Sequence, residues 1–148
     1  MKAYLDSCVF IIYAEKKIGN SQIIIESAKR GLFLPVISFH TIHEVVHNLK
    51  TRHGKDIASA VFSLIYLLPT LEIVSKERII AYQKEHCYSI KDKDDLPHVI
   101  AYLLSKSDCF VTINRRLTQM AMPENVIFLT PKEFVENMLK TKGFDMHY

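Results

Sequence analysis

Carboxylates gather at two places that stand far apart in the chain. Asp6 follows a short apolar run at residues 2–5, and Asp92, Asp94 and Asp95 lie within four positions just ahead of a helix-like apolar segment. Carboxylates clustered without cationic partners repel one another, so such a cluster usually persists because a cation neutralises it. Oxygen ligands favour Mg²⁺ or Mn²⁺ over zinc. If the two places converge, they suit metal-assisted hydrolysis of a phosphodiester.

A polar strand end follows the aspartate cluster after one helix. Pro97 fits the first turn of a helix, so we expect this helix to start at about Asp95. A short β-type run at residues 109–112 comes next, and Asn114 follows it directly. Because parallel strands deliver the residues at their carboxyl ends to one edge of a sheet, we expect Asp94 or Asp95 to lie near Asn114.

The elements that must position these residues alternate along the chain. Strands are expected at residues 2–5, 32–37, 71–74, 109–112 and 126–129, and helices at 9–17, 21–30, 38–52, 57–68, 75–86, from 95, at 117–122 and from 130. This alternation predicts an α/β fold, a three-layer α/β/α sandwich with a central parallel sheet. The length of 148 residues, without a low-complexity linker, predicts a single domain over residues 1–148.

The composition is that of an ordinary globular protein, and the net charge of +3 permits a polyanionic partner without demanding one. Cys8, Cys87 and Cys109 are widely spaced and form no CxxC pair, so we expect reduced cysteines and a cytoplasmic protein. The apolar stretch 57–68 is too short to span a bilayer, so no membrane association is expected. Since this helix is apolar almost all round, it belongs in a core or in a subunit interface.

Two of the candidate residues also fit purely structural roles. Asp6 or Ser7 suits the cap of the helix expected at 9–17. Thr41 and Glu44 match a capping box, but Ser38 is the better N-cap of the helix at 38–52, which places Glu44 in the second turn.

Glu44 belongs to a literal HExxH string with His43 and His47. On a helix this pattern places two imidazoles on one face for zinc and a glutamate as base, which would make a zinc hydrolase. Nothing downstream supplies an obvious third zinc ligand, and the hypothesis leaves Asp6 and the aspartate cluster unexplained.

Short motifs over nearly the whole chain resemble those of PIN-domain nucleases, in the same order. They are Tyr4-Leu5-Asp6-Ser7, Glu44 in mid-helix, Asp92-Lys93-Asp94-Asp95-Leu96-Pro97, Phe110-Val111-Thr112-Ile113-Asn114 and the closing residues 128–134. The resemblance implies a Mg²⁺- or Mn²⁺-dependent endoribonuclease that cuts single-stranded RNA, often the VapC-type toxin of a toxin–antitoxin pair. It also implies an antitoxin protein as a partner and, with the apolar helix at 57–68, a homodimer.

Carried over by position, the resemblance makes Asp6, Glu44 and Asp95 the three acidic metal ligands, with Asp94 as the competing candidate for the third place. Ser7 and Thr112 are expected to support these ligands. The basic residues that flank the same edge are candidates for holding RNA phosphates: Lys91, Lys93, Arg115 and Arg116.

The chain departs from the family pattern at two positions. Cys8 stands where the family often has asparagine, and Asn114 stands at the fourth acidic position, which is commonly aspartate. An amide still offers a carbonyl oxygen as a ligand or holds a water, so Asn114 is kept among the catalytic candidates. The lower charge leaves a second hypothesis open, a catalytically weakened PIN-like module that binds RNA or protein without cutting.

Overall fold

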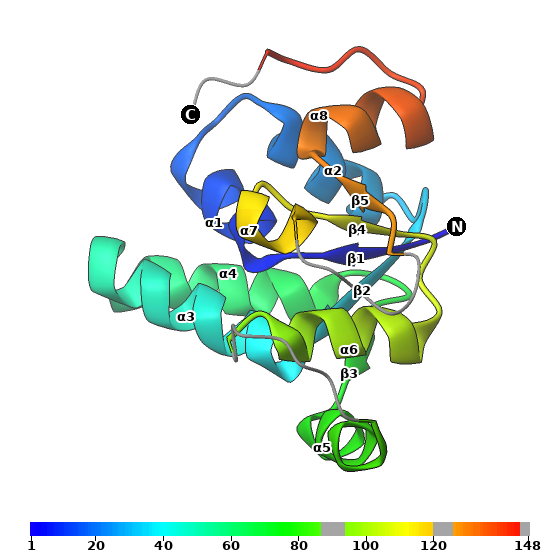
Figure 1. The fold of residues 1–148 in the computed structure, drawn as a ribbon. Coiled ribbons are helices and arrows are strands. Elements are labelled where there is room, and N and C mark those ends of the chain that lie inside the picture. Colours follow the sequence, from blue (N-terminus) through cyan, green and yellow to red (C-terminus); the bar gives the residue numbers. More distant parts are fainter. Residues whose placement is uncertain (87–93, 120–125, 146–148) are drawn as a thin grey trace.

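The computed structural model describes residues 1–86, 94–119 and 126–145 (Figure 1). Within these ranges, five parallel strands form one sheet in the order β3-β2-β1-β4-β5. The strands are β1 (Lys2–Leu5), β2 (Leu34–Ser38), β3 (Glu72–Val74), β4 (Cys109–Val111) and β5 (Phe128–Leu129). Each strand is short and reaches the next through a helical connection, as parallel pairing requires.

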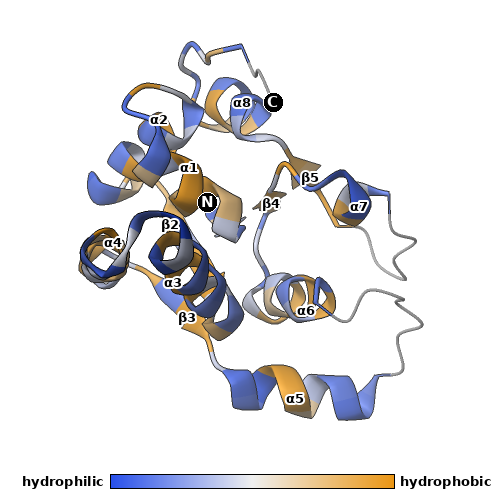
Figure 2. Ribbon diagram, turned by 90° about the vertical axis from the view of Figure 1, so that its left-hand side faces the viewer, coloured by the Kyte–Doolittle hydropathy of each residue, from blue (hydrophilic) through white to orange (hydrophobic). Residues whose placement is uncertain are grey.

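Helices cover both faces of this sheet, so the predicted three-layer α/β/α sandwich is confirmed (Figure 2). One face carries α1 (Ser7–Glu15), α2 (Asn20–Lys29), α3 (Phe39–His53), α4 (Lys55–Leu67), α8 (Pro131–Glu133) and the π-helix η1 (Phe134–Met138), and the other carries α5 (Lys76–Glu85), α6 (Leu96–Ser105) and the short α7 (Arg115–Thr118). Successive side chains of a strand point to opposite faces. Accordingly Ala3 and Leu5 join the first core and Tyr4 joins the second.

The strand order defines where the fold opens. From β1 the chain moves outward through β2 and β3, then crosses back to place β4 and β5 on the other side of β1. Ligands of open α/β sheets bind outside the carboxyl ends of the strands at such a switch point. Asp6 and Thr112 are the residues that directly follow β1 and β4, and the Asp6 N–H donates to the Val111 carbonyl at 3.0 Å.

The helix starts decide two alternatives that the sequence left open. Asp6, and not Ser7, is the N-cap of α1, because its Oδ1 accepts the Ser7 N–H at 2.8 Å. Ser38 caps α3, and its partner in the capping box is Thr41. The capping box between Thr41 and Glu44 is therefore wrong, and Glu44 lies in the second turn of α3.

Two apolar segments, strand β2 and helix α4, lie in contrasting environments. Strand β2 lies inside the sheet, and Pro35 is tolerated there because its pairing with β3 begins one residue later, at Val36. Helix α4 buries one stripe only, and its outer surface exposes Phe62, Tyr66 and Leu67 by 41%, 54% and 79%. Across the ranges that the structure describes, no helix combines the length and the apolar character needed to cross a membrane.

Candidate active site

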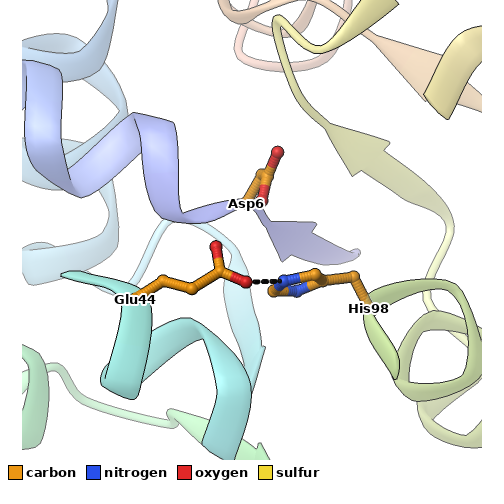
Figure 3. Close-up of side chains that lie close together, drawn as sticks. All are labelled: Asp6, Glu44 and His98. Carbon is orange, nitrogen blue, oxygen red and sulfur yellow. Dashed lines mark hydrogen bonds and ion pairs between the residues drawn. The ribbon is translucent and has the colours of Figure 1, made fainter. Parts of the chain in front are cut away.

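Three ionisable side chains converge next to the switch point (Figure 3). Asp6 comes from the junction of β1 and α1, Glu44 from the second turn of α3 and His98 from the first turn of α6. One potential ligand atom of each lies within 4.8 Å of the other two. Asp6 is 7% exposed and His98 is 2% exposed, whereas Glu44 is half-buried and borders an open cleft.

Both oxygens of the Asp6 carboxylate are held by hydrogen bonds. Oδ1 accepts the Ser7 N–H, and Oδ2 accepts the Thr112 hydroxyl at 2.6 Å. Thr112 Oγ1 in turn accepts the Asn114 N–H at 3.0 Å. These bonds join the carboxyl ends of β1 and β4, and they set the orientation of the carboxylate before any ligand arrives.

Glu44 is fixed as firmly from two sides. Its Oε2 accepts the Ser7 hydroxyl at 2.8 Å, and its Oε1 lies 2.6 Å from His98 Nε2. On the far side of the imidazole, Nδ1 lies 2.7 Å from the Tyr4 hydroxyl oxygen. A buried network therefore runs from the β1 core to the Glu44 carboxylate.

The electrostatics of this network favour an ion pair between His98 and Glu44. Burial disfavours the imidazolium, yet Tyr4, Glu44 and Asp6 outweigh it and hold the pKa of His98 well above its usual range. Burial likewise works against the Glu44 carboxylate, but hydrogen bonds from His98 and Ser7 hold the pKa of Glu44 below its usual range. The pKa of His40 is lowered by burial and by the neighbouring His98. His40 is thus neutral at the rim of the site.

A cleft of about 480 Å³ opens beside Glu44. Its lining consists of polar and charged side chains with one proline: His40, His43, Glu44, Asn48, Asp94, Asp95, Pro97, Asn114 and Arg116. Asp95 is 9% exposed and stands at the N-cap position of α6, and the Asn114 side-chain N–H lies 3.5 Å from its Oδ1. The side-chain oxygen of Asn114, Oδ1, accepts the Arg116 N–H at 3.0 Å. Asp95 and Asn114 therefore meet at the same edge.

The remaining sequence candidates, Asp94 and Asp95 included, do not belong to the group of three converging side chains found among the described residues. Asp94 is exposed and lines the cleft, whereas Arg115 is exposed at the start of α7. His43 and His47 are exposed, and neither belongs to the group of metal-ligating side chains found among the described residues. The HExxH string therefore gains no support as a zinc site. Lys91, Asp92 and Lys93 lie outside the described residues.

His98 is the residue that the sequence reasoning missed. It stands in an otherwise apolar helix whose neighbours are buried, so it resembled a core residue. One available signal was its place three residues after Asp95, which puts both in the first turn of α6 and at the carboxyl edge of the sheet.

Solved structures of VapC-type toxins and of a toxin–antitoxin complex share this parallel α/β/α architecture, which is therefore PIN-like. VapBC2 from Rickettsia felis, bound to a promoter DNA fragment, aligns with TM-score 0.62 and 18% identity over 88% of this chain and 98% of that chain. VapC20 from Mycobacterium tuberculosis, a toxin that cleaves the sarcin–ricin loop, aligns with TM-score 0.57 and 12% identity over 80% of this chain and 96% of that chain. A chain of a toxin–antitoxin complex from Klebsiella pneumoniae aligns with TM-score 0.54 and 20% identity over 87% of this chain and 97% of that chain.

At these identities the likeness establishes the fold. No protein-family model and no curated protein sequence matches the chain. The resemblance to VapC-type PIN domains is thus confirmed in the architecture, and the roles of individual side chains rest on the geometry described above.

Proposed function

We propose that the chain is a metal-dependent endoribonuclease of the VapC toxin type, which hydrolyses phosphodiester bonds in single-stranded RNA. The observation that carries this proposal is the convergence of Asp6 and Glu44 beside a polar cleft that Asp95 and Asn114 also line or border. These residues come from four separate places in the chain, and a fold with the VapC architecture brings them to its switch point.

The donor set fits a divalent cation. The carboxylates of Asp6 and Glu44 are held rigidly, and each oxygen keeps a second lone pair beyond its hydrogen bond. Asp95 completes the acidic set from the cleft wall, with Asp94 as the exposed competitor. Bound Mg²⁺ or Mn²⁺ would supply polarisation of the phosphodiester and a more acidic water.

The side chains of this chain do the positioning. Thr112 and Ser7 hold the carboxylates in place in advance, so no reorganisation is needed when substrate binds. Arg116 lines the cleft and provides positive charge for an RNA phosphate. The Asn114 N–H donates to Thr112 and its side-chain Oδ1 accepts the Arg116 N–H, so the amide is held in position and its remaining lone pair or N–H would serve the attacking water or the cation. Water then attacks phosphorus in line with the leaving oxygen.

Partners follow from the same assignment. An antitoxin would occlude the acidic edge, as the structural likeness to toxin–antitoxin complexes suggests. The apolar outer surface of α4, made by Phe62, Tyr66 and Leu67, is the proposed homodimer contact. Cys8 and Cys109 are free thiols, which suits the reducing cytoplasm in which we place the reaction.

The test is RNA cleavage by the chelated protein with Mg²⁺ or Mn²⁺ added back. Asp6→Asn keeps a side chain that can cap α1, so the variant should fold normally. We expect it to lose cleavage by roughly 100-fold or more, because a charged ligand is gone. Asp56→Asn in the first turn of α4 serves as the matched control with wild-type activity. Cleavage that persists in chelator, or an active Asp6→Asn protein, would refute the proposal.

A second candidate function is binding without cleavage. It is favoured by Asn114, which replaces a carboxylate, and by the His98–Glu44 ion pair, which cancels another negative charge. Both features weaken cation binding relative to four carboxylates. Calorimetry with Mn²⁺ beside an RNA-binding assay separates the two functions, since a binding module would take up RNA with neither metal uptake nor cleaved products.

A further inference from the structure

His98 sits where a metal ligand would sit, although the sequence motifs did not include it. Its imidazole is 2% exposed and points from α6 toward Glu44, with Asp6 beside both (Figure 3). Nδ1 faces the Tyr4 hydroxyl at 2.7 Å and Nε2 faces Glu44 Oε1 at 2.6 Å. Each ring nitrogen thus has one partner, and the two partners are of different kinds.

The Tyr4 side of the ring is an outer support. The Tyr4 hydroxyl donates its single hydrogen to Ser38 Oγ at 3.0 Å, so in the contact with His98 the donor is the Nδ1–H. The Thr41 hydroxyl lies 3.1 Å from the same oxygen and holds it further. Metal-binding histidines almost always donate the second ring N–H to a fixed acceptor of this kind.

The Glu44 side of the ring requires a positive species. With Nδ1–H donated to Tyr4, a neutral ring would present the Nε2 lone pair to a carboxylate oxygen at 2.6 Å, which is repulsive. At 2.6 Å a proton lies between them, as Nε2–H···Oε1, and a divalent cation that displaces this proton would bind both atoms once they move apart. Because one potential ligand atom each of Asp6, Glu44 and His98 lies within 4.8 Å of the other two, a cation there would gain three ligands from three elements.

We propose that His98 Nε2 is a direct nitrogen ligand of the divalent cation, together with Asp6 and Glu44, and that it makes this site prefer Mn²⁺ over Mg²⁺. Imidazole is a poor ligand for Mg²⁺, which takes oxygen donors and keeps its waters, whereas later divalent metals accept nitrogen. The inference rests on the proposed function only in placing a divalent cation at this edge.

Pulsed electron paramagnetic resonance of bound Mn²⁺ tests the ligand directly. We expect nitrogen hyperfine coupling in the wild-type protein, which changes to the ¹⁵N pattern when histidine is ¹⁵N-labelled. His98→Gln should abolish the coupling, and His47→Gln, an exposed histidine on α3, should keep it. The isotope comparison needs no substitution and establishes whether a histidine nitrogen binds the cation, and the loss of coupling in His98→Gln identifies that histidine as His98.

Calorimetry with Mn²⁺ and Mg²⁺ alone measures the preference. Wild-type protein should bind Mn²⁺ at least about 10-fold more tightly than Mg²⁺, and His98→Gln should reduce that ratio. Tyr4→Phe should weaken Mn²⁺ binding by roughly 10-fold while keeping the nitrogen coupling, because it removes only the outer support.

The outcomes separate this inference from the proposed function. Bound Mn²⁺ without histidine coupling, coupling retained in His98→Gln, or no Mn²⁺ uptake would each overturn the nitrogen ligand. Mn²⁺-dependent RNA cleavage without histidine coupling would leave the ribonuclease intact. Histidine coupling in a protein that cuts no RNA would leave the ligand intact and refute the ribonuclease.

Discussion

At the scale of single residues, the Asp6 carboxylate has a structural role as a helix cap and the proposed role of a metal ligand. Oδ1 caps α1 through the Ser7 N–H, and Oδ2 accepts the Thr112 hydroxyl from the neighbouring strand. The sequence offered helix capping and metal binding as alternatives for Asp6. The geometry makes them compatible, since each carboxylate oxygen accepts one hydrogen bond and keeps a further lone pair for a cation.

Thr112 is the residue through which this arrangement can be tested. Thr112→Val keeps the shape of the side chain but leaves Asp6 Oδ2 without its donor in a buried place. We expect stability to fall by about 1–3 kcal/mol in urea unfolding and cleavage to fall roughly 10-fold. Thr112→Ser restores the hydroxyl and should restore both. A Thr112→Val protein that matches wild type in both measurements would show that the hydrogen bond does not matter.

The third acidic metal ligand is either Asp95 or Asp94, and substitution of each aspartate tests which one it is. Asp95 is 9% exposed beside Asn114, whereas Asp94 is exposed. We predict that Asp95→Ala lowers cleavage by roughly 100-fold or more and weakens Mn²⁺ binding, while Asp94→Ala changes either by only a few-fold. The Asp95 side chain makes no capping bond to α6, so the melting temperature should stay within a few degrees. An Asp95→Ala protein of full activity would remove Asp95 from the ligand set.

At the scale of elements, α3 connects the fold to the site. Its capping box places Ser38 and Thr41 against the Tyr4 hydroxyl, and one turn later the same helix delivers Glu44. The start of α3 and the orientation of His98 are therefore parts of one hydrogen-bonded unit. A change at the cap should be felt at the carboxylate.

Ser38→Ala is the corresponding prediction. The Ser38 hydroxyl caps α3 and also accepts from the Tyr4 hydroxyl, and both side chains are fully buried. We therefore expect this substitution to lower the unfolding free energy by about 1–2 kcal/mol and to weaken Mn²⁺ binding. Ser75→Ala removes the N-cap of α5, which lies outside this network, and is the matched control. It should cost a similar cap energy with unchanged metal affinity. Equal metal affinity in both variants would disconnect the cap of α3 from the site.

At the scale of the whole molecule, the outer surface of α4 is an apolar surface that the single chain leaves exposed to solvent. Phe62 and Tyr66 pack against each other with tilted rings whose centroids are 4.9 Å apart, and Leu67 on the same helix is 79% exposed. An apolar surface of this kind marks an interaction site.

We predict that light scattering at micromolar concentration gives twice the 17.1 kDa chain mass. Tyr66→Glu should shift the protein to the monomer, since a carboxylate buried in an apolar contact has no partner. Ile18→Glu, which changes a residue that is 73% exposed and outside α4, should leave the dimer intact. A wild-type mass of 17.1 kDa would rule the homodimer out.

Much of the architecture follows from neighbours in the sequence. Pro97 in the first turn of α6 and the Thr130–Glu133 capping box of α8 are local signals, and both helices begin close to the expected positions 95 and 130. Alternating strand and helix runs then predict a parallel sheet, and a parallel sheet brings the residues that follow its strands to one edge. Asp6 and Asn114 were found at this edge for that reason.

The amino-acid sequence by itself thus determined the α/β sandwich and the acidic edge, because periodicity and capping are encoded within a few residues. Only the tertiary structure decided that His98, 54 residues away, meets Glu44 and that Tyr4, 94 residues away, orients its ring. The place of His98 three residues after Asp95 put it near the acidic edge, but the partners of its ring follow only from the packing of α6 against β2 and α3. The physical reason is that partners of a buried polar group are chosen by the fold in three dimensions, and no local pattern records that choice.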